Sequence, residues 1–213
     1  MDTLKYILDK FNLSYSKNTH FPLEIPDFDR TDLAKLFKEL GFKEGVEVGV
    51  EKGIYSEIIC KTNPGVKLHC VDAWERYKGY RDFVESMEPN YEETKWRLHQ
   101  YDCNLIKKYS MDAVKDFKDN SLDFVYIDGN HDFQHITNDL VEWRKKIRVG
   151  GIIAGDDYRK HPIPSVMHVA EVVNLYTRLY DIKPWFVLGL KAKTKGLKRD
   201  NNRNFMWVKL NKY

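Results

Sequence analysis

Residues 122–128 read LDFVYID, an apolar run that ends abruptly in an acid. A run of this length and composition predicts a buried β-strand whose carboxyl end lies at Asp128. Helical periodicity follows from Phe133 to Ile147, and a further apolar strand is expected from Gly151 to Ala154. Strands that alternate with helices are typical of a mainly parallel sheet with helices on both faces.

The same alternation extends toward both ends of the chain. Further strands are expected at 45–50 (GVEVGV), 67–73 (KLHCVDA) and 105–110, and further helices at 54–61, 76–100, 113–117 and 166–179. Two final apolar runs, 185–190 and 205–210, predict a hairpin. The chain is therefore expected to be α/β and Rossmann-like: a seven-stranded, mainly parallel sheet with an antiparallel C-terminal hairpin strand and helices on both faces.

Residues 1–44 are expected to form a helical extension of the single domain that spans 45–213. A first amphipathic run carries apolar residues at helical spacing, and a second begins at Thr31–Asp32 and ends at Gly41, a plausible C-cap. The apolar positions of the two runs are Leu4, Ile7, Leu8, Phe11, Leu33, Leu36, Phe37 and Leu40.

Composition argues against several classes of protein. The net charge of +3 is too small to favour a nucleic-acid partner, and the locally basic stretch 191–203 is expected to be a solvated loop. Three cysteines without C-x-x-C spacing argue against a disulfide scaffold or a cysteine zinc site, and favour a cytoplasmic location. The N-terminal sequence MDTLKYILDKFN does not resemble a signal peptide, and no apolar stretch approaches the ~18 residues of a membrane span.

The end of the first expected strand carries a glycine turn, with Glu47, Gly49 and Gly53 in the sequence EVGVEKG. Gly49 permits a tight turn, and Gly53 lets the next helix begin close to a bound ligand. The spacing differs from the dinucleotide fingerprint Gly-x-Gly-x-x-Gly. An acid two residues before the first glycine suits a ligand that carries an ammonium group.

Polar residues also end the second and third strands. Asp72 is placed to accept hydrogen bonds from ribose hydroxyls, and Trp74 to cover an adenine face; a helix cap and a core tryptophan are the structural alternatives. Ser110 and Met111 follow the third strand, where adenine would be rimmed, although Ser110 also suits an N-cap.

Acids end the fourth and fifth strands: Asp128 in YIDGNH (126–131), and Asp156 with Asp157 in GGIIAGDDY (150–158). Neighbouring strands lie ~4.8 Å apart, so the three carboxylates are expected to converge. Their mutual repulsion raises their pKa values unless a cation is bound, and Mg²⁺ is the ordinary hard cation for oxygen ligands. Helix-cap or loop roles are the alternative for any one of these acids.

Together these motifs resemble those of class I methyltransferases that depend on S-adenosylmethionine (SAM). The string EVGVEKGIYS (47–56) is similar to the first motif of cation-dependent O-methyltransferases, which include caffeoyl-CoA and catechol enzymes. The motifs ID-G-x-H and GG-x-x-x-GDDY resemble those of a bacterial family of metal-dependent methyltransferases, which includes macrolide-sugar and aminocoumarin-sugar O-methyltransferases. The resemblance covers about Gly45 to Tyr158, and the count and order of strands match that fold.

The resemblance implies a site for SAM, a site for Mg²⁺ or another divalent cation, and a general base. Some family members carry the base as an acid where this chain has Asn130, and His131 is the natural substitute, acting beside Asp128. The cation would be held by Asp128, Asp156 and Asp157. The cofactor would be held by Glu47, Gly49, Gly53, Ser56, Asp72, Ala73, Trp74, Ser110, Met111 and Asp128.

The expected function is SAM-dependent, metal-dependent O-methylation of a small-molecule or sugar hydroxyl by a monomer or a homo-oligomer. Three alternatives stay open. A non-catalytic SAM- or nucleotide-binding module would bind cofactor without metal dependence. An amino-directed nucleic-acid methyltransferase usually carries Asn/Asp-Pro-Pro-Tyr/Phe where residues 128–131 read DGNH. A zinc site at His131 and His135 would need glutamate at Asp132.

Overall fold

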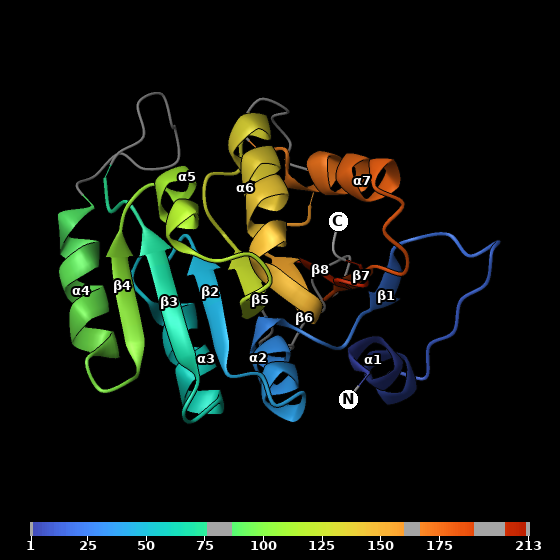
Figure 1. Cartoon of the computed structure of the whole chain (residues 1–213), viewed down its shortest axis with the longest axis horizontal. Helices are drawn as coiled ribbons and strands as arrows, with labels where there is room; N and C mark the ends of the chain where they lie inside the picture. The colour runs from blue at the N-terminus through green and yellow to red at the C-terminus, as the bar shows by residue number, and fades with distance from the viewer. Residues whose placement is uncertain (1, 76–86, 160–166, 190–202, 212–213) are drawn as a thin grey trace, which may run out of the picture.

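A single mixed sheet of eight strands forms the centre of the molecule (Figure 1). The computed structural model describes residues 2–75, 87–159, 167–189 and 203–211. The strand order across the sheet is β1-β7-β8-β6-β5-β2-β3-β4. The strands are β1 (Leu23–Ile25), β2 (Glu44–Val48), β3 (Lys67–Asp72), β4 (Cys103–Lys107), β5 (Leu122–Ile127), β6 (Ile147–Gly155), β7 (Phe186–Leu188) and β8 (Asn204–Val208).

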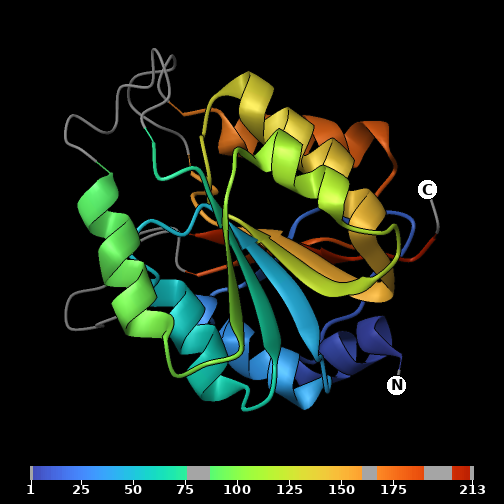
Figure 2. The ribbon, with the colours of Figure 1, turned by 60° about the vertical axis from the view of Figure 1, so that its left-hand side comes forward.

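The helices divide between the two faces of the sheet, as the view in Figure 2 shows. Helices α1 (Thr3–Lys10), α2 (Arg30–Glu39) and α3 (Ile54–Thr62) pack in one apolar core, which α4 (Glu88–Leu98) borders through Leu98. Helices α5 (Ser110–Ala113), α6 (Phe133–Lys146) and α7 (Val169–Leu179) pack in the other, together with the short 3-10 helix η1 (Val114–Asp116). The α/β class with helices on both faces is therefore confirmed.

Strands β6, β5, β2, β3 and β4 are parallel, and β8 runs antiparallel to both β6 and β7. This arrangement confirms the mainly parallel sheet with an antiparallel C-terminal strand. Parallel strands place their carboxyl ends at one edge of the sheet, and side chains after β2, β3, β4 and β5 therefore gather there.

The described part of the chain contains eight strands where the sequence predicts seven, and this part of the prediction is corrected. The added strand, β1, lies in the N-terminal segment that was expected to be helical, and it pairs in parallel with β7. The Leu23 amide donates to the Trp185 carbonyl at 2.9 Å. A three-residue strand shows no periodicity of its own, because its pairing partner lies far away in the chain.

Several element bounds also differ from expectation. Strand β6 begins at Ile147, because Leu122 pairs with Ile147 before a register shift, and α6 therefore ends at Lys146. Helix α2 begins at Arg30, since Asp29 is its N-cap and forms a capping box with Asp32. Residues 76–86, 160–166 and 190–202 lie outside the described part of the chain, including most of the basic stretch and the first part of the predicted helix 76–100.

No helix among the described residues has the length and apolar character to cross a membrane.

Candidate functional site

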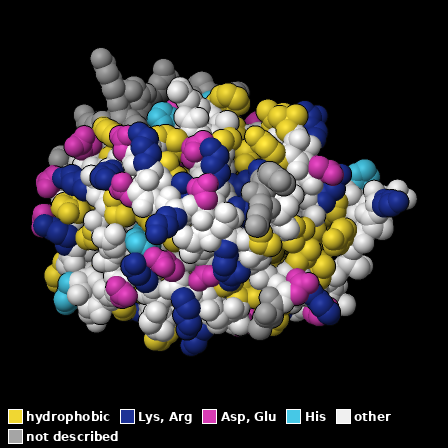
Figure 3. Space-filling view, in the orientation of Figure 1, with side chains coloured by type: hydrophobic (Ala, Val, Ile, Leu, Met, Phe, Trp, Pro, Cys, Tyr) yellow, Lys and Arg dark blue, Asp and Glu magenta, His cyan; other side chains and the backbone are white. Residues whose placement is uncertain are grey.

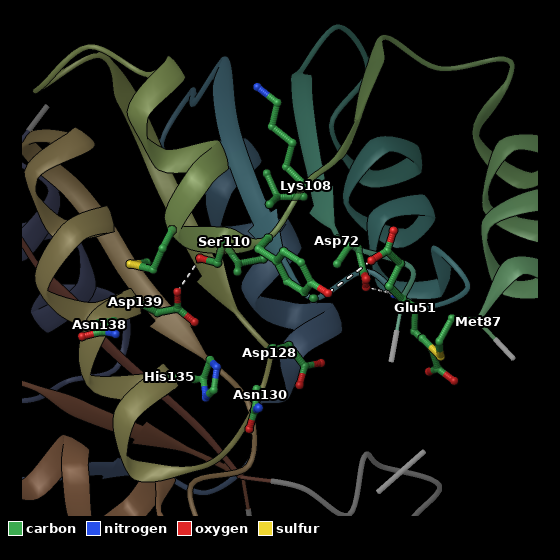
Figure 4. A pocket seen from close by; sticks show the side chains of 18 of the residues that line it. Glu51, Asp72, Met87, Lys108, Ser110, Asp128, Asn130, His135, Asn138 and Asp139 are labelled. Atoms are coloured by element: carbon green, nitrogen blue, oxygen red, sulfur yellow. Dashed lines mark hydrogen bonds between the residues drawn. The ribbon is translucent and has the colours of Figure 1, made fainter. Parts of the chain in front are cut away.

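A cavity of about 400 Å³ opens at the carboxyl ends of the parallel strands (Figure 4). Its walls come from the loops after β2, β3, β4 and β5, from the first turn of α5 and from the first two turns of α6. It is lined by Val48, Gly49, Glu51, Val71, Asp72, Ala73, Glu75, Met87, Lys108, Tyr109, Ser110, Met111, Asp128, Gly129, Asn130, Gln134, His135, Asn138 and Asp139. The cavity lies where ligands bind in open α/β sheets.

The turn after β2 needs glycine at its first position. Gly49 has φ +87°, and a Cβ atom there would lie 2.0 Å from the Asp128 carbonyl oxygen. The Gly49 amide donates to the Val71 carbonyl at 2.9 Å, and the Asp128 amide donates to the Val48 carbonyl at 2.7 Å. The ends of three neighbouring strands are thereby held together beneath the cavity.

The Asp72 carboxylate organises the loops that follow β2 and β3. One oxygen, Oδ2, accepts from the amides of Val50 and Glu51, both at 2.9 Å, and Oδ1 accepts from the Trp74 amide at 2.7 Å. Three of the roughly four acceptor positions of the carboxylate are thereby used, and Oδ1 retains a second lone pair. Asp72 therefore holds the glycine turn in place and still faces the cavity.

Six of the ten residues expected at the cofactor line this cavity: Gly49, Asp72, Ala73, Ser110, Met111 and Asp128. The other four, Glu47, Gly53, Ser56 and Trp74, lie outside its described lining. The Trp74 indole donates to the Glu51 carbonyl at 2.8 Å and its ring packs 4.7 Å from that of Tyr91. Gly53 is the left-handed N-cap of α3.

Glu47 is buried on the opposite face of the sheet from the cavity. Its neighbours Val46 and Val48 pack with α5, α6 and α7, so Glu47 points toward α3, where the Ser56 hydroxyl donates to it. Burial raises the pKa of Glu47 to about 8, against the lowering effect of the Ser56 hydrogen bond. At neutral pH this side chain is therefore mainly a neutral acid.

An acidic cluster lies at the ends of β5 and β6, next to the cavity. His131 Nε2 lies 3.5 Å from Asp128 Oδ1 and 3.5 Å from Asp157 Oδ2. One ligand atom from each of these three residues lies within 4.8 Å of the others. His131 Nε2 is buried and has no hydrogen-bond partner among the described residues. Two carboxylates and an unsatisfied imidazole nitrogen are a donor set that fits a divalent cation.

Asp156 lies in the same cluster but has a different environment. Its Oδ1 accepts from the Asp157 amide at 2.8 Å, and its Oδ2 lies 3.3 Å from the guanidinium of Arg30. The same guanidinium lies 3.9 Å from Asp128 and 5.5 Å from the ring centre of Tyr55. The three predicted aspartates thus gather at the strand ends, but Asp156 pairs with an arginine supplied by α2.

The electrostatics of the cluster follow from burial and from crowding of like charges. Burial raises the pKa of Asp128, and burial followed by the Asp128 carboxylate raises the pKa of Asp156 to about 8. Burial lowers the pKa of His131, but the carboxylates of Asp128, Asp157 and Asp156 outweigh it and the net pKa is raised. The cluster therefore favours added positive charge, either as protons or as a cation.

Two residues near the site were missed by the sequence analysis. No feature of the local sequence identifies Arg30, because nothing near it indicates that α2 reaches the strand ends. Asp139 could have been identified, because it lies on the apolar face of α6 with Ile136, Leu140 and Trp143, and it is 3% exposed. A charged residue on the buried face of a helix indicates a special role.

The zinc site considered at His131 and His135 is not supported by the geometry. His135 Nδ1 pairs with Asp132 Oδ2 at 2.8 Å, and the candidate metal-binding group among the described residues contains His131 but not His135.

Comparison with known proteins agrees with this fold. A protein-family model described as a methyltransferase domain matches residues 46–158, more than half of the chain. An uncharacterised protein of Acanthamoeba polyphaga mimivirus is 35% identical over 78 residues, which cover 34% of this chain and 35% of the viral protein. The chain thus matches about a third of the length of that relative.

Two solved structures share the fold at low identity. An O-methyltransferase from Bacillus cereus, in complex with SAH, superposes with a TM-score of 0.60 at 16% identity, over 97% of this chain and 90% of that one. The O-methyltransferase TomG from Streptomyces achromogenes, in complex with SAM, superposes with a TM-score of 0.56 at 17% identity, over 98% of this chain and 90% of that one. From the match to its family model, the chain belongs to the methyltransferase-domain family.

Proposed function

We propose that this methyltransferase transfers the methyl group of SAM to a hydroxyl group of a small molecule or sugar, with a divalent cation at the acidic cluster. The observation that carries the proposal is the convergence of Asp128, His131 and Asp157 beside the cavity, with His131 Nε2 buried and unsatisfied.

The cavity supports SAM as the cofactor. Relatives of the same fold bind SAM or S-adenosylhomocysteine (SAH), its demethylated product. Asp72 would accept hydrogen bonds from the ribose hydroxyls, and Val71 and Met111 offer apolar contact to a purine. Asp128 lines the cavity and also belongs to the acidic cluster, and the transferable methyl group would therefore lie near that cluster.

Asp128 and Asp157 would hold the cation, with Asp156 kept beside them by Arg30. When bound, a divalent cation lowers the pKa of a substrate hydroxyl and fixes its position. His131 Nε2 lies 3.5 Å from carboxylate oxygens of Asp128 and Asp157, and it would accept the hydroxyl proton where some family members use the acid replaced here by Asn130. Asn130 Oδ1 instead accepts from the Asp132 amide at 3.0 Å.

The charge pattern of the face drawn in Figure 3 supports a small acceptor over a nucleic acid. Figure 3 shows lysine and arginine side chains interspersed with aspartate and glutamate over the drawn face. Nucleic-acid binding depends on clustered positive charge that neutralises phosphates. A nucleic-acid methyltransferase and a non-catalytic SAM-binding module remain the two competing functions, and the acceptor that is methylated distinguishes them.

The test combines calorimetry with a methyl-transfer screen on the wild type and two variants. Asp157→Asn removes one charge from the cluster and suits the backbone, because Asp157 has φ +56° and asparagine tolerates this region. Asp181→Asn is the matched control, since Asp181 also has positive φ and its side chain is 81% exposed. Wild type and control are expected to bind SAH and to methylate hydroxylated compounds only with Mg²⁺ or Mn²⁺.

Asp157→Asn is expected to bind SAH within about twofold of wild type and to lose about a hundredfold or more of the cation-dependent activity. Activity that chelators leave unchanged would contradict the cation. SAH binding without methyl transfer to any hydroxyl acceptor would favour the non-catalytic binding module. Methyl transfer to RNA or DNA would favour the nucleic-acid methyltransferase. Absence of SAH binding would overturn the cofactor assignment.

A further inference from the structure

The cavity contains a buried carboxyl group that the proposed chemistry does not use. Asp139 lies on α6, is 3% exposed, and forms part of the cavity wall next to Ser110 (Figure 4). Burial raises its pKa to about 6, against the Ser110 hydrogen bond. A buried carboxylate is unfavourable unless its oxygens accept hydrogen bonds, so its position on the apolar face of α6 needs an explanation.

Hydrogen bonds around Asp139 have a fixed direction. The Trp143 indole can only donate, and its Nε1 donates to the Ser110 hydroxyl oxygen at 2.8 Å. The Ser110 hydroxyl is then free to donate its own proton, and its acceptor is Asp139 Oδ1. The second carboxylate oxygen, Oδ2, accepts no hydrogen bond from any residue that the structure describes. One acceptor oxygen is therefore left at the cavity wall.

The position of this oxygen matches one part of SAM. Figure 4 shows Ser110 and Asp139 on one side of the cavity and Asp72 and Glu51 on the other. With the ribose at Asp72 and the methyl group toward Asp128, the base extends toward α5 and α6, where Met111 offers apolar contact. The exocyclic amino group is the hydrogen-bond donor on the edge of adenine, whereas N1 and N7 accept.

We propose that Asp139 is a specificity-determining residue, which selects adenine by accepting a hydrogen bond from its 6-amino group through Oδ2. The inference rests on the proposed function, since it assumes that SAM occupies the cavity. A purine with a 6-oxo group would present an acceptor to this carboxylate, and the pair would repel. The Trp143–Ser110 pair acts as a positioning device, because it occupies Oδ1 and leaves Oδ2 for the ligand.

The same hydrogen-bond direction predicts the effect of Asp139→Asn. Because Ser110 donates to residue 139, the asparagine would place its amide oxygen toward Ser110 and its NH₂ group toward the ligand. An NH₂ group repels a 6-amino group and donates to a 6-oxo group. The variant is therefore expected to prefer S-inosylhomocysteine, the 6-oxo analogue of SAH.

The experiment measures binding of SAH and of S-inosylhomocysteine by calorimetry to wild type, Asp139→Asn and the control Asp112→Asn. Asp112 lies close by on α5, and its side chain is 62% exposed. Wild type and control should prefer SAH by about thirtyfold or more, the loss expected when a polar site meets a mismatched group. Asp139→Asn should bind SAH about tenfold or more weakly and the 6-oxo analogue more tightly.

A second variant, Asp139→Asn with Ser110→Ala, tests the positioning device. Without the serine hydroxyl the asparagine amide is free to rotate, and the gain for the 6-oxo analogue should disappear. Circular dichroism and thermal unfolding establish that each variant is folded. If folded Asp139→Asn keeps the preference of wild type, or loses both ligands equally, the inference is overturned. If wild type binds neither ligand, the proposed function has failed instead.

Discussion

Replacing Glu47 by glutamine is expected to make the protein more stable at alkaline pH. Burial raises the pKa of Glu47 to about 8 from 4.5, so the native state keeps a proton that the unfolded chain releases above pH 4.5. Between these two values the native state binds more protons than the unfolded state, and the free energy of unfolding falls as pH rises. Glutamine resembles the protonated acid, accepts the Ser56 hydrogen bond and does not titrate.

The magnitude follows from proton linkage. The buried carboxyl group, with pKa values of 4.5 in the unfolded state and about 8 in the folded state, lowers the free energy of unfolding by roughly 1 kcal/mol at pH 5.5 and by between roughly 4 and 5 kcal/mol at pH 8.5. The free energy of unfolding of Glu47→Gln, minus that of wild type, should therefore increase by about 3 kcal/mol over this range. Above pH 8 the difference should level off, because both states are then ionised.

Urea denaturation at four pH values between 5.5 and 8.5, followed by circular dichroism without ligand or cation, measures this difference. Glu92→Gln is the matched control: the Glu92 side chain is 60% exposed, and its substitution should give a difference that is constant with pH. A Glu47→Gln difference that is also constant, or that shrinks toward high pH, would refute the reasoning and place an ionised carboxylate inside the protein.

Further substitutions test the packing around the site. Gly49→Ala should destabilise the protein by more than about 2 kcal/mol and abolish SAH binding, because its Cβ would collide with the Asp128 carbonyl; calorimetry and urea unfolding report both effects, and unchanged binding would refute the turn geometry. Tyr126→Phe should lower the free energy of unfolding by about 1–3 kcal/mol, since the buried side-chain amide oxygen of Asn204 loses its donor; an unchanged urea midpoint would contradict this. Lys209→Met should cost about 2 kcal/mol or more, because the buried ammonium donates three hydrogen bonds; unfolding at neutral pH measures it.

Much of the fold was predictable because its parallel strands are apolar runs with sharp ends. Strand β5 ends at Ile127 and β3 ends at Asp72, each one residue before the predicted end. Strand β1 was not predictable, because three residues carry no period and are strand only through pairing with β7. Local pattern determines elements that are buried on both faces, whereas edge elements depend on tertiary contacts.

The site divides in the same way. Asp128 and Asp157 come together because topology places neighbouring strand ends side by side, which follows from the order of strands. The pairing of Arg30 with Asp156 joins residues 126 positions apart and has no local signature. The position of Glu47 was accessible in principle: strand alternation places it opposite Val46 and Val48, away from the cavity that Val48 lines.

The pairing of β1 with β7 has a consequence for association between molecules. An edge strand of a sheet offers unpaired amides and carbonyls to which a strand of another chain can hydrogen-bond, and long flat edge strands promote aggregation. Here β1 pairs with β7, so that the edge strand on this side of the sheet is only three residues long. A chain truncated before Arg30 would expose Phe186–Leu188, an apolar segment, and would be expected to self-associate more readily than the untruncated chain.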